Sequence, residues 1–283
     1  MTPEPLYRPE GLNPAYQLRY TWTGWPSGRL LPQVDVLDTV KPLWEQDGMR
    51  LLEHSWSEHE VQLAFSARPE VCPVFVAARA KGRLQHALRE ADVDFSGFSR
   101  KVAVRSVGDN TTAEVEAYIA RQVGKAHFID PQFHKMMEEF TVLCPEVDLS
   151  RPSESARGRY WYNLHVVLVV VERSRIADRQ RLEIIRDGCF RIAAKKGHTI
   201  AALSAMPDHL HIALRGNIEH TPQEIALGFQ NNLAYLLGQI PIWNAGFYAG
   251  TFSEYDMGAI RARTKRWLEG CDNEAKEEGA GPP

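Results

Sequence analysis

The feature that most constrains the fold of this 283-residue chain is that its sequence repeats itself. Shifted by 149 residues, the sequence aligns with itself without a gap from Val36 to Ile119. Twelve of the 84 aligned positions are identical, where ordinary composition would give about five or six by chance. The identical pairs match Gly48 with Gly197 and Pro73 with Pro222, residue types that place special demands on the backbone. A duplicated sequence predicts two related structural units.

Both halves predict the same order of elements. The first half is expected to contain strand 16–23, helix 36–47, strands 50–56 and 60–66, a helix from Pro73, a strand after Gly97-Phe98 and helix 111–123. The second half is expected to contain strand 164–171, helix 178–195, strands 198–204 and 208–215, a helix from Pro222, a strand after Gly246-Phe247 and helix 257–269. Each half therefore reads β-α-β-β-α-β-α. The predicted class is α+β, with two tandem ferredoxin-like units, each an antiparallel sheet flanked by helices with an extra C-terminal helix.

Domain boundaries follow from the repeat. Residues 1–124 form the first predicted unit and residues 160–268 the second. Residues 125–159 hold several prolines, serines and glutamates and are expected to connect the units. The polar, glycine-rich residues 269–283 are expected to form a disordered tail.

Composition sets looser limits. The chain is 44% hydrophobic, enough for globular cores, and no apolar run is long enough to span a membrane. Cys72, Cys144, Cys189 and Cys271 form no CxxC pair, which argues against a zinc ribbon or a disulfide framework. Separated cysteines and the lack of an N-terminal signal pattern predict a cytoplasmic protein.

Charge gives a mixed indication about nucleic-acid binding. The net charge is −3, so the whole chain is not basic. Basic residues nevertheless gather in three local clusters, which are the candidate DNA-binding residues: Arg79, Lys81 and Arg83; Arg100, Lys101 and Arg105; Arg261, Arg263, Lys265 and Arg266. Such clusters are more often solvated helix faces than binding surfaces.

The second half carries a pair of histidines in a predicted strand. Alternate residues of a strand point the same way, so His209 and His211 present two imidazoles side by side. Neutral imidazoles can bind a divalent cation that polarises a phosphate oxygen. A bare His-x-His is most often two ordinary polar residues. The longer sequence Met-Pro-Asp-His-Leu-His, from Met206 to His211, is far more specific.

The first half carries a tyrosine and a glutamine one turn apart on its last predicted helix. Tyr118 and Gln122 stand at positions i and i+4, so they share one helix face. A tyrosine at such a place is, in isolation, most often structural.

Together the two motifs resemble those of the single-tyrosine, single-strand DNA transposases. That family, which includes the smallest insertion-sequence and REP-associated tyrosine transposases, has a Met-Pro-(Asp/Asn)-His-x-His strand and a last-helix Tyr-Ile-x-x-Gln. The resemblance covers residues 16–123 and 160–268. It implies that Tyr118 is a nucleophile, that His209, His211 and Gln122 bind Mg²⁺ or Mn²⁺, and that the partner is single-stranded or hairpin DNA. The implied product is a 5′-phosphotyrosine with a released 3′-hydroxyl, which the reverse reaction would rejoin.

The two halves hold complementary parts of this set. An offset of 149 pairs Tyr118 with Trp267, Gln122 with Cys271, and the two histidines with Glu60 and Gln62. Neither half is complete, but together they contain one full set. The resembled transposases are homodimers whose site can combine a histidine pair from one subunit with a tyrosine helix from the other. The chain is therefore expected to be a fused pseudo-dimer with one composite site, able to act as a monomer.

Two other functions are compatible with the sequence. A catalytically inactive hairpin-binding protein or repressor would explain why each half-site is damaged. An unrelated metal-dependent hydrolase or a protein-interaction module would suit the near-neutral charge. The distance from Tyr118 to His209 and His211 is the observation that best separates these functions.

Overall fold

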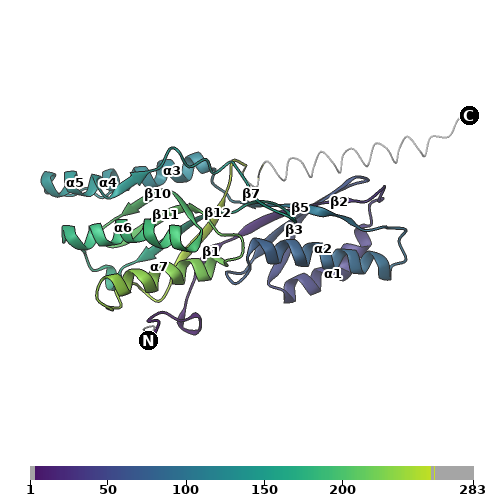
Figure 1. The fold of residues 1–283 in the computed structure, drawn as a ribbon, viewed down its shortest axis with the longest axis horizontal. Coiled ribbons are helices and arrows are strands. Elements are labelled where there is room, and N and C mark those ends of the chain that lie inside the picture. Colours follow the sequence, from purple (N-terminus) through teal and green to yellow (C-terminus); the bar gives the residue numbers. More distant parts are fainter. Residues whose placement is uncertain (1–3, 256–257, 259–283) are drawn as a thin grey trace, which may run out of the picture.

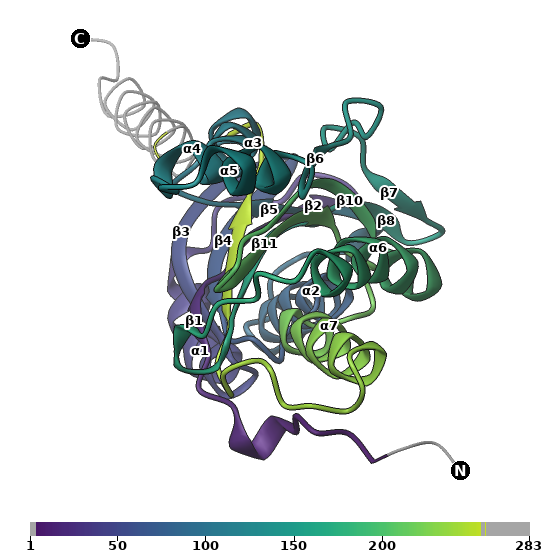
Figure 2. The same ribbon diagram turned by 90° about the vertical axis from the view of Figure 1, so that its left-hand side faces the viewer.

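The computed structural model describes residues 4–255 and residue 258, which form two six-stranded sheets side by side (Figure 1). One sheet has the strand order β3-β4-β2-β5-β8-β7 and is called the first sheet. The other has the order β1-β12-β9-β11-β10-β6 and is called the second sheet. Helices α1, α2, α6 and α7 cover one side of the sheets, and α3, α4 and α5 lie on the other (Figures 1 and 2).

Each sheet is built around four strands and two helices in the ferredoxin-like order. The first unit contains β2 (Arg19–Pro26), α1 (Val34–Gln46), β3 (Met49–Ser57), β4 (Glu60–Ala67), α2 (Pro73–Glu90) and β5 (Phe98–Val107). The second contains β9 (Asn163–Val169), α6 (Arg179–Lys196), β10 (Thr199–Ala205), β11 (His209–Arg215), α7 (Pro222–Leu236) and β12 (Tyr248–Phe252). In both, the first strand lies between the third and the fourth, and all four are antiparallel. The predicted fold class is confirmed.

The helix ends follow the residues that predicted them. Pro73 and Pro222 occupy the first turns of α2 and α7, where a missing backbone N–H costs nothing. Gly197 adopts the left-handed conformation that ends α6, with φ of 73°.

Beneath the helices a single large core joins the two units, and its largest side chains include Trp22, Trp44 and Tyr162.

The two units exchange edge strands. Strand β1 (Ala15–Gln17) precedes β2 in the chain, yet it pairs in parallel with β12 of the second sheet. Strand β8 (Gly158–Trp161) precedes β9, yet it pairs in parallel with β5 of the first sheet. Each unit therefore supplies one strand to the sheet of the other, and the boundaries at residues 124 and 160 do not separate independent bodies.

The expected connector is part of the folded structure. Residues 125–159 hold α5 (Pro131–Glu138), β6 (Thr141–Leu143) and β7 (Ser153–Ser155), as well as the start of β8. Strand β6 extends the second sheet beside β10, and β7 extends the first beside β8. Met137 and Phe140 are buried in the core. The segment is thus anchored by apolar burial and strand pairing, although its prolines and polar residues predicted only a link.

Reciprocal hydrogen bonds mark the place where the strands cross between units. The backbone N–H of Arg19 donates to Thr251 Oγ1 at 2.8 Å, and that of Asn163 donates to Ser106 Oγ at 3.0 Å. Thr251 Oγ1 in turn donates to the carbonyl of Val107 at 2.6 Å, and Ser106 Oγ to that of Phe252 at 2.8 Å. The two units therefore make matching hydrogen bonds where their strands cross.

The repeat offset is not constant along the chain, which corrects the gapless alignment. Arg19 pairs with Ser66 and Val107 in the first sheet, where Asn163 pairs with Arg215 and Phe252 in the second. The third strands therefore keep the offset of 149, whereas the fourth strands differ by 145 and the first by 144. The gapless alignment paired Gly97-Phe98 with Gly246-Phe247 because the residue types are the same. These residues do not occupy equivalent positions in the two sheets.

Several expectations fall beyond the described residues. The second predicted C-terminal helix and tail, Trp267, Cys271 and the basic cluster at 261–266 lie in that part of the chain. The predicted pairing of Tyr118 with Trp267 therefore stays a prediction. Among the described residues, no helix is both long enough and apolar enough to cross a membrane.

Candidate functional site

Helix α3 (Thr112–Ala120) leaves the first sheet and lies on the second. A capping box at Thr111 and Glu114 fixes its start, because each side chain bonds to the backbone N–H of the other residue. The N–H of Thr112 donates to the carbonyl of Ser253, just after β12, at 2.8 Å. The helix of the first unit is therefore attached to the second unit at its first turn.

Small residues on the second sheet let α3 approach closely. Val115 and Ile119 of the helix pack against Ala202 of β10 and Ala213 of β11, and all four are buried. Ala213 lies two positions beyond His211, so both face the helix. Helix α3 thus sits directly above the strand that carries the histidines.

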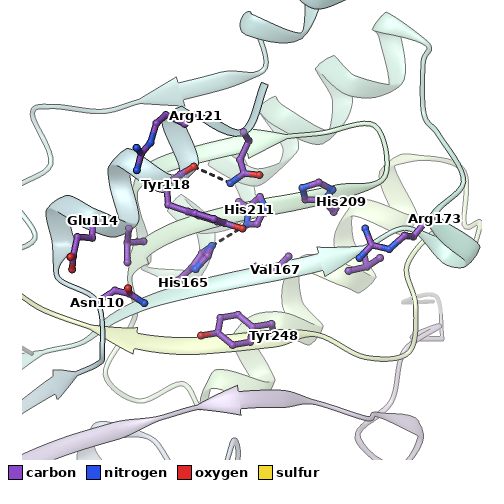
Figure 3. Close-up of a pocket in the computed structure, with 13 residues that line it drawn as sticks. Asn110, Glu114, Tyr118, Arg121, His165, Val167, Arg173, His209, His211 and Tyr248 are labelled. Carbon is purple, nitrogen blue, oxygen red and sulfur yellow. Dashed lines mark hydrogen bonds between the residues drawn. The ribbon is translucent and has the colours of Figure 1, made fainter. Parts of the chain in front are cut away.

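This packing brings Tyr118 over the histidines of the other unit (Figure 3). The ring centroid of Tyr118 lies 5.4 Å from that of His211 and 5.9 Å from that of His165, both in edge-to-face geometry. The tyrosine is 40% exposed, whereas His211 is buried. The structure therefore joins the two motifs that the sequence left in separate halves.

Tyr118 and the nearby histidines line a cavity of about 780 Å³. Its walls come from α3, α4 (Gln122–Lys125), β9, β11 and β12. The lining residues are Asn110, Glu114, Val115, Tyr118, Arg121, Gln122, His165, Val167, Val169, Arg173, His209, His211 and Tyr248. All four residues assigned to the site by the sequence, Tyr118, Gln122, His209 and His211, line this one cavity.

A third histidine lies behind the predicted pair. His165 on β9 has its Nε2 3.1 Å from Nδ1 of His211, and the two rings are stacked with centroids 5.2 Å apart. Burial lowers the pKa of His165 to about 4. Burial, together with His165, His209 and Lys125 nearby, lowers the pKa of His211 to about 2. Both imidazoles are therefore neutral at neutral pH, as a metal ligand must be.

Hydrogen-bond contacts engage the same ring nitrogen, Nδ1, in both predicted histidines, His209 and His211. His209 Nδ1 lies 2.7 Å from Asp208 Oδ1, and Asp208 Oδ2 accepts from Arg173 at 3.1 Å. With the ring proton on Nδ1 of each histidine, the Nε2 atoms of His209 and His211 each have a lone pair for a cation. His211 Nε2 is buried and has no hydrogen-bond partner, an arrangement that natural structures rarely leave without a function.

Gln122 completes a donor set of two nitrogens and one oxygen. Its Nε2 donates to the carbonyl of Tyr118 at 2.9 Å, which leaves Oε1 as the acceptor of the amide. In the described part of the chain, no three His, Cys, Asp or Glu side chains are grouped to hold a metal ion. The candidate set therefore fits a divalent cation only with an amide oxygen as the third protein ligand and open positions for other oxygens.

The first sheet has no such histidines at the equivalent places. Gln62 on β4 pairs with Thr23 in the same register in which His211 pairs with Val167, and Glu60 takes the place of His209. These counterparts follow from strand register, so this part of the repeat alignment is correct.

The two predicted basic clusters that fall within the described residues do not line the cavity. Arg79 and Arg83 on α2 form ion pairs with Asp47 at 3.6 and 3.1 Å, and Lys81 donates to the carbonyl of Ser99. Arg105 pairs with Glu254 at 2.7 Å and stacks over Trp161. Arg100 and Lys101 are exposed on β5 of the first sheet. The cations beside the cavity are instead Arg121, Lys125, Arg173 and Arg175, none of which belongs to a predicted cluster.

Comparison with known proteins finds a family match in the second unit. Residues 159–262 match the model of the IS200-like transposases. No curated protein matches the chain. A solved structure from Deinococcus radiodurans R1, assigned to the transposases, is 20% identical, with 38% of this chain and 88% of that chain covered and a TM-score of 0.30. The regulatory subunit of aspartate kinase from Thermus thermophilus is 9% identical, with 76% and 92% covered and a TM-score of 0.20.

The fold and the strand motif of the second unit agree with this family match. The span that matches the IS200-like transposases, residues 159–262, includes the strand with His209 and His211.

Proposed function

We propose that this protein nicks and rejoins single-stranded DNA at one composite site, with Tyr118 as the nucleophile. The observation that carries the proposal is the ring contact between Tyr118 of the first unit and His211 of the second, in a cavity shared with Gln122 and His209. Hairpin-flanked single strands are the proposed substrates. Their unpaired part can enter the cavity, where a base-paired duplex would hold the scissile phosphate away from the tyrosine.

The proposed cofactor is Mg²⁺ or Mn²⁺, held by Nε2 of His209, Nε2 of His211 and Oε1 of Gln122. When bound, the ion would supply Lewis-acid polarisation of a phosphate oxygen and would orient the phosphate. The proposal is supported by the unpartnered Nε2 of His211 and by the hydrogen bonds that occupy both Nδ1 atoms. Such partners behind a ligand fix the tautomer and orientation of its ring.

Tyr118 performs the covalent step. Its phenolic oxygen attacks the phosphorus, the phenolic proton passes to solvent, and the bond from phosphorus to the 3′-oxygen breaks. The departing 3′-oxygen takes a proton from solvent, so one strand ends as a 5′-phosphotyrosine and the other as a 3′-hydroxyl. The reverse reaction restores the phosphodiester and the tyrosine. Because the phosphodiester energy is kept in the linkage to Tyr118, rejoining needs no nucleotide cofactor.

Covalent trapping tests the nucleophile. The protein is incubated with a hairpin-flanked single strand and Mn²⁺, and adducts are resolved on denaturing gels and located by mass spectrometry. We expect an adduct on Tyr118 that Tyr118→Phe abolishes, while Tyr248→Phe, which changes the other tyrosine of the cavity, retains it. An adduct formed by Tyr118→Phe would place the nucleophile elsewhere. Hairpin binding without any adduct would favour the inactive hairpin-binding protein or repressor.

Calorimetric titration with Mn²⁺ tests the metal site. We expect His209→Ala/His211→Ala to abolish the binding, because it removes two of three protein ligands. The matched variant Glu60→Ala/Gln62→Ala changes the equivalent strand of the first unit and should leave the affinity unchanged. Equal affinities in the wild type and the histidine variant would remove the metal ion from the site.

A further inference from the structure

A second cavity opens directly beside the proposed nucleophile. It has a volume of about 290 Å³ and is lined by Gln122, Lys125, Ala126, Phe128, Arg175, Met206, Pro207, Asp208 and His209. It is called the side cavity. Gln122 and His209 line both this cavity and the main one. A strand whose phosphate lies between Tyr118 and the histidines therefore reaches the side cavity with its next nucleotide.

The charge of the side cavity is positive and available to a ligand. Lys125 and Arg175 are exposed, and within the described residues neither forms an ion pair with a carboxylate. The carboxylate that lines the cavity, Asp208, is engaged by His209 at 2.7 Å and by Arg173 at 3.1 Å. Lys125 Nζ lies 4.3 Å from the ring centroid of Tyr118, so its charge stands next to the proposed reacting group.

The remaining wall of the side cavity is apolar, and contacts with the protein core and with α5 fix its position. Met206 and Pro207 are buried, and they precede the strand that carries the histidines. Phe128 is half-buried, and its ring contacts Phe133 of α5 edge to face at 5.0 Å between centroids. Paired cations beside an aromatic ring are the combination by which proteins hold single-stranded nucleic acids, since the cations take the phosphates and the ring takes a base.

We infer that the side cavity is a nucleotide subsite for the unpaired residue next to the scissile phosphate. Lys125 and Arg175 bind its phosphate, and its base rests against Phe128, Met206 and Pro207. A base can enter a recess of this kind only when it is unstacked, so the ligand is a single strand. The inference rests on the proposed function, because it takes the position of the scissile phosphate from the assignment of Tyr118.

The first experiment measures the binding of fluorescein-labelled oligothymidylate by anisotropy across a range of salt concentrations. All proteins carry Tyr118→Phe and the buffer contains a chelator, so the result does not depend on cleavage or on metal. Each lost phosphate contact with a single strand should reduce the slope of log K against log salt by about 0.7. Lys125→Ala/Arg175→Ala should therefore reduce it by about 0.7, because both cations bind the same phosphate.

The matched control removes the same charge from the opposite side of the second sheet. Arg191→Ala/Lys195→Ala changes two exposed cations of α6 and should leave the slope unchanged. Equal reductions in both variants, an unchanged slope in Lys125→Ala/Arg175→Ala, or no binding by the parent protein would each overturn the inference. Thermal unfolding followed by circular dichroism verifies that every variant is folded.

The second experiment tests the base contact. The parent protein should bind oligothymidylate more tightly than an abasic strand of equal length, and Phe128→Leu should reduce that preference roughly 5-fold or more. An unchanged preference would show that no base rests on Phe128. Adduct formation by the wild type is measured separately. An adduct on Tyr118 combined with unchanged salt slopes would reject the subsite and keep the proposed function. Reduced slopes without any adduct on Tyr118 would reject Tyr118 as the nucleophile and keep only the binding of a single strand by the side cavity.

Discussion

Tyr118 and His211 belong to different repeats, and the edge of one ring faces the other at 5.4 Å between centroids. The contact exists because α3 crosses from the first sheet to the second and is attached there through Thr112 and Ser253. Neither repeat contains both residues, so the cavity between Tyr118 and His211 is a property of the whole chain.

Mixing two inactive variants should not restore activity. Tyr118→Phe lacks the proposed nucleophile and His209→Ala lacks a proposed metal ligand, and the proposed site draws on both units of one chain. We expect the mixture to form no more covalent DNA adduct than either variant alone, as judged on denaturing gels. Recovery of adduct would mean that tyrosine helices are exchanged between chains.

His165 should act on metal affinity without binding the metal. His165→Phe removes the hydrogen-bond partner of His211 Nδ1, and loss of such a partner commonly lowers metal affinity about 10- to 100-fold. His165→Gln keeps an acceptor at a similar distance along the side chain and should recover much of the loss. Calorimetric titration with Mn²⁺ measures both variants. Unchanged affinity in His165→Phe would restrict His165 to a packing role.

Widening the contact between α3 and the second sheet should impair catalysis more than folding. Ala213→Leu adds volume beneath α3 at a fully buried position, at a cost of about 1–3 kcal/mol in stability. Displacing Tyr118 by about 1 Å should reduce adduct formation on the order of 100-fold. Ala64→Leu adds the same volume at the repeat counterpart in the first sheet and should keep the adduct. Urea unfolding and adduct kinetics are compared for both variants, and equal activity losses would contradict the explanation.

The stability of the protein should fall in acid partly through His198. Burial, with His220 and Lys196 nearby, lowers the pKa of His198 to about 4, and its Nδ1 accepts the backbone N–H of Asn217 at 2.9 Å. The unfolded histidine titrates near 6.5, so the unfolded state binds the proton first as the pH falls. The contribution of neutral His198 is complete above about pH 6.5 and is lost towards pH 4, by up to about 1.4 kcal/mol per pH unit.

Urea unfolding between pH 7 and pH 4 in the presence of a chelator measures this effect. His198→Gln does not titrate, so its free energy of unfolding should decline less steeply than that of the wild type. Parallel curves for the two proteins would show that His198 is not the group responsible.

The sequence predicted the repeated fold because its strongest local patterns, the helix-starting prolines and the alternating strand residues, correspond to elements of the structure. Pro73 and Pro222 start helices, and His209 and His211 share one strand face. The exchange of β1 and β8 could not be predicted in this way. These strands have three and four residues, too few for a periodic pattern, and β1 pairs with residues more than 200 positions away.

The candidate site was predicted in part. The motifs located Tyr118, Gln122, His209 and His211, but not His165, whose only signal is a histidine within an otherwise apolar strand. The basic clusters show a different limit of prediction from sequence, which concerns the partners of charged side chains. Local density of Arg and Lys cannot reveal that Arg83 is paired with Asp47, because that partner lies 36 positions away in the sequence. Lys125 and Arg175 are 50 positions apart in the sequence and become neighbours only through the fold.

The exchanged edge strands determine the order in which this chain can complete its structure during synthesis. The first sheet lacks β8 until residue 161 has been made, and β1 near the N-terminus has no partner until β12 follows at residue 248. Contacts over such separations form slowly because long loops must close first. The N-terminal strand therefore remains an unpaired edge for most of translation, a state in which nascent chains depend on chaperones to avoid aggregation.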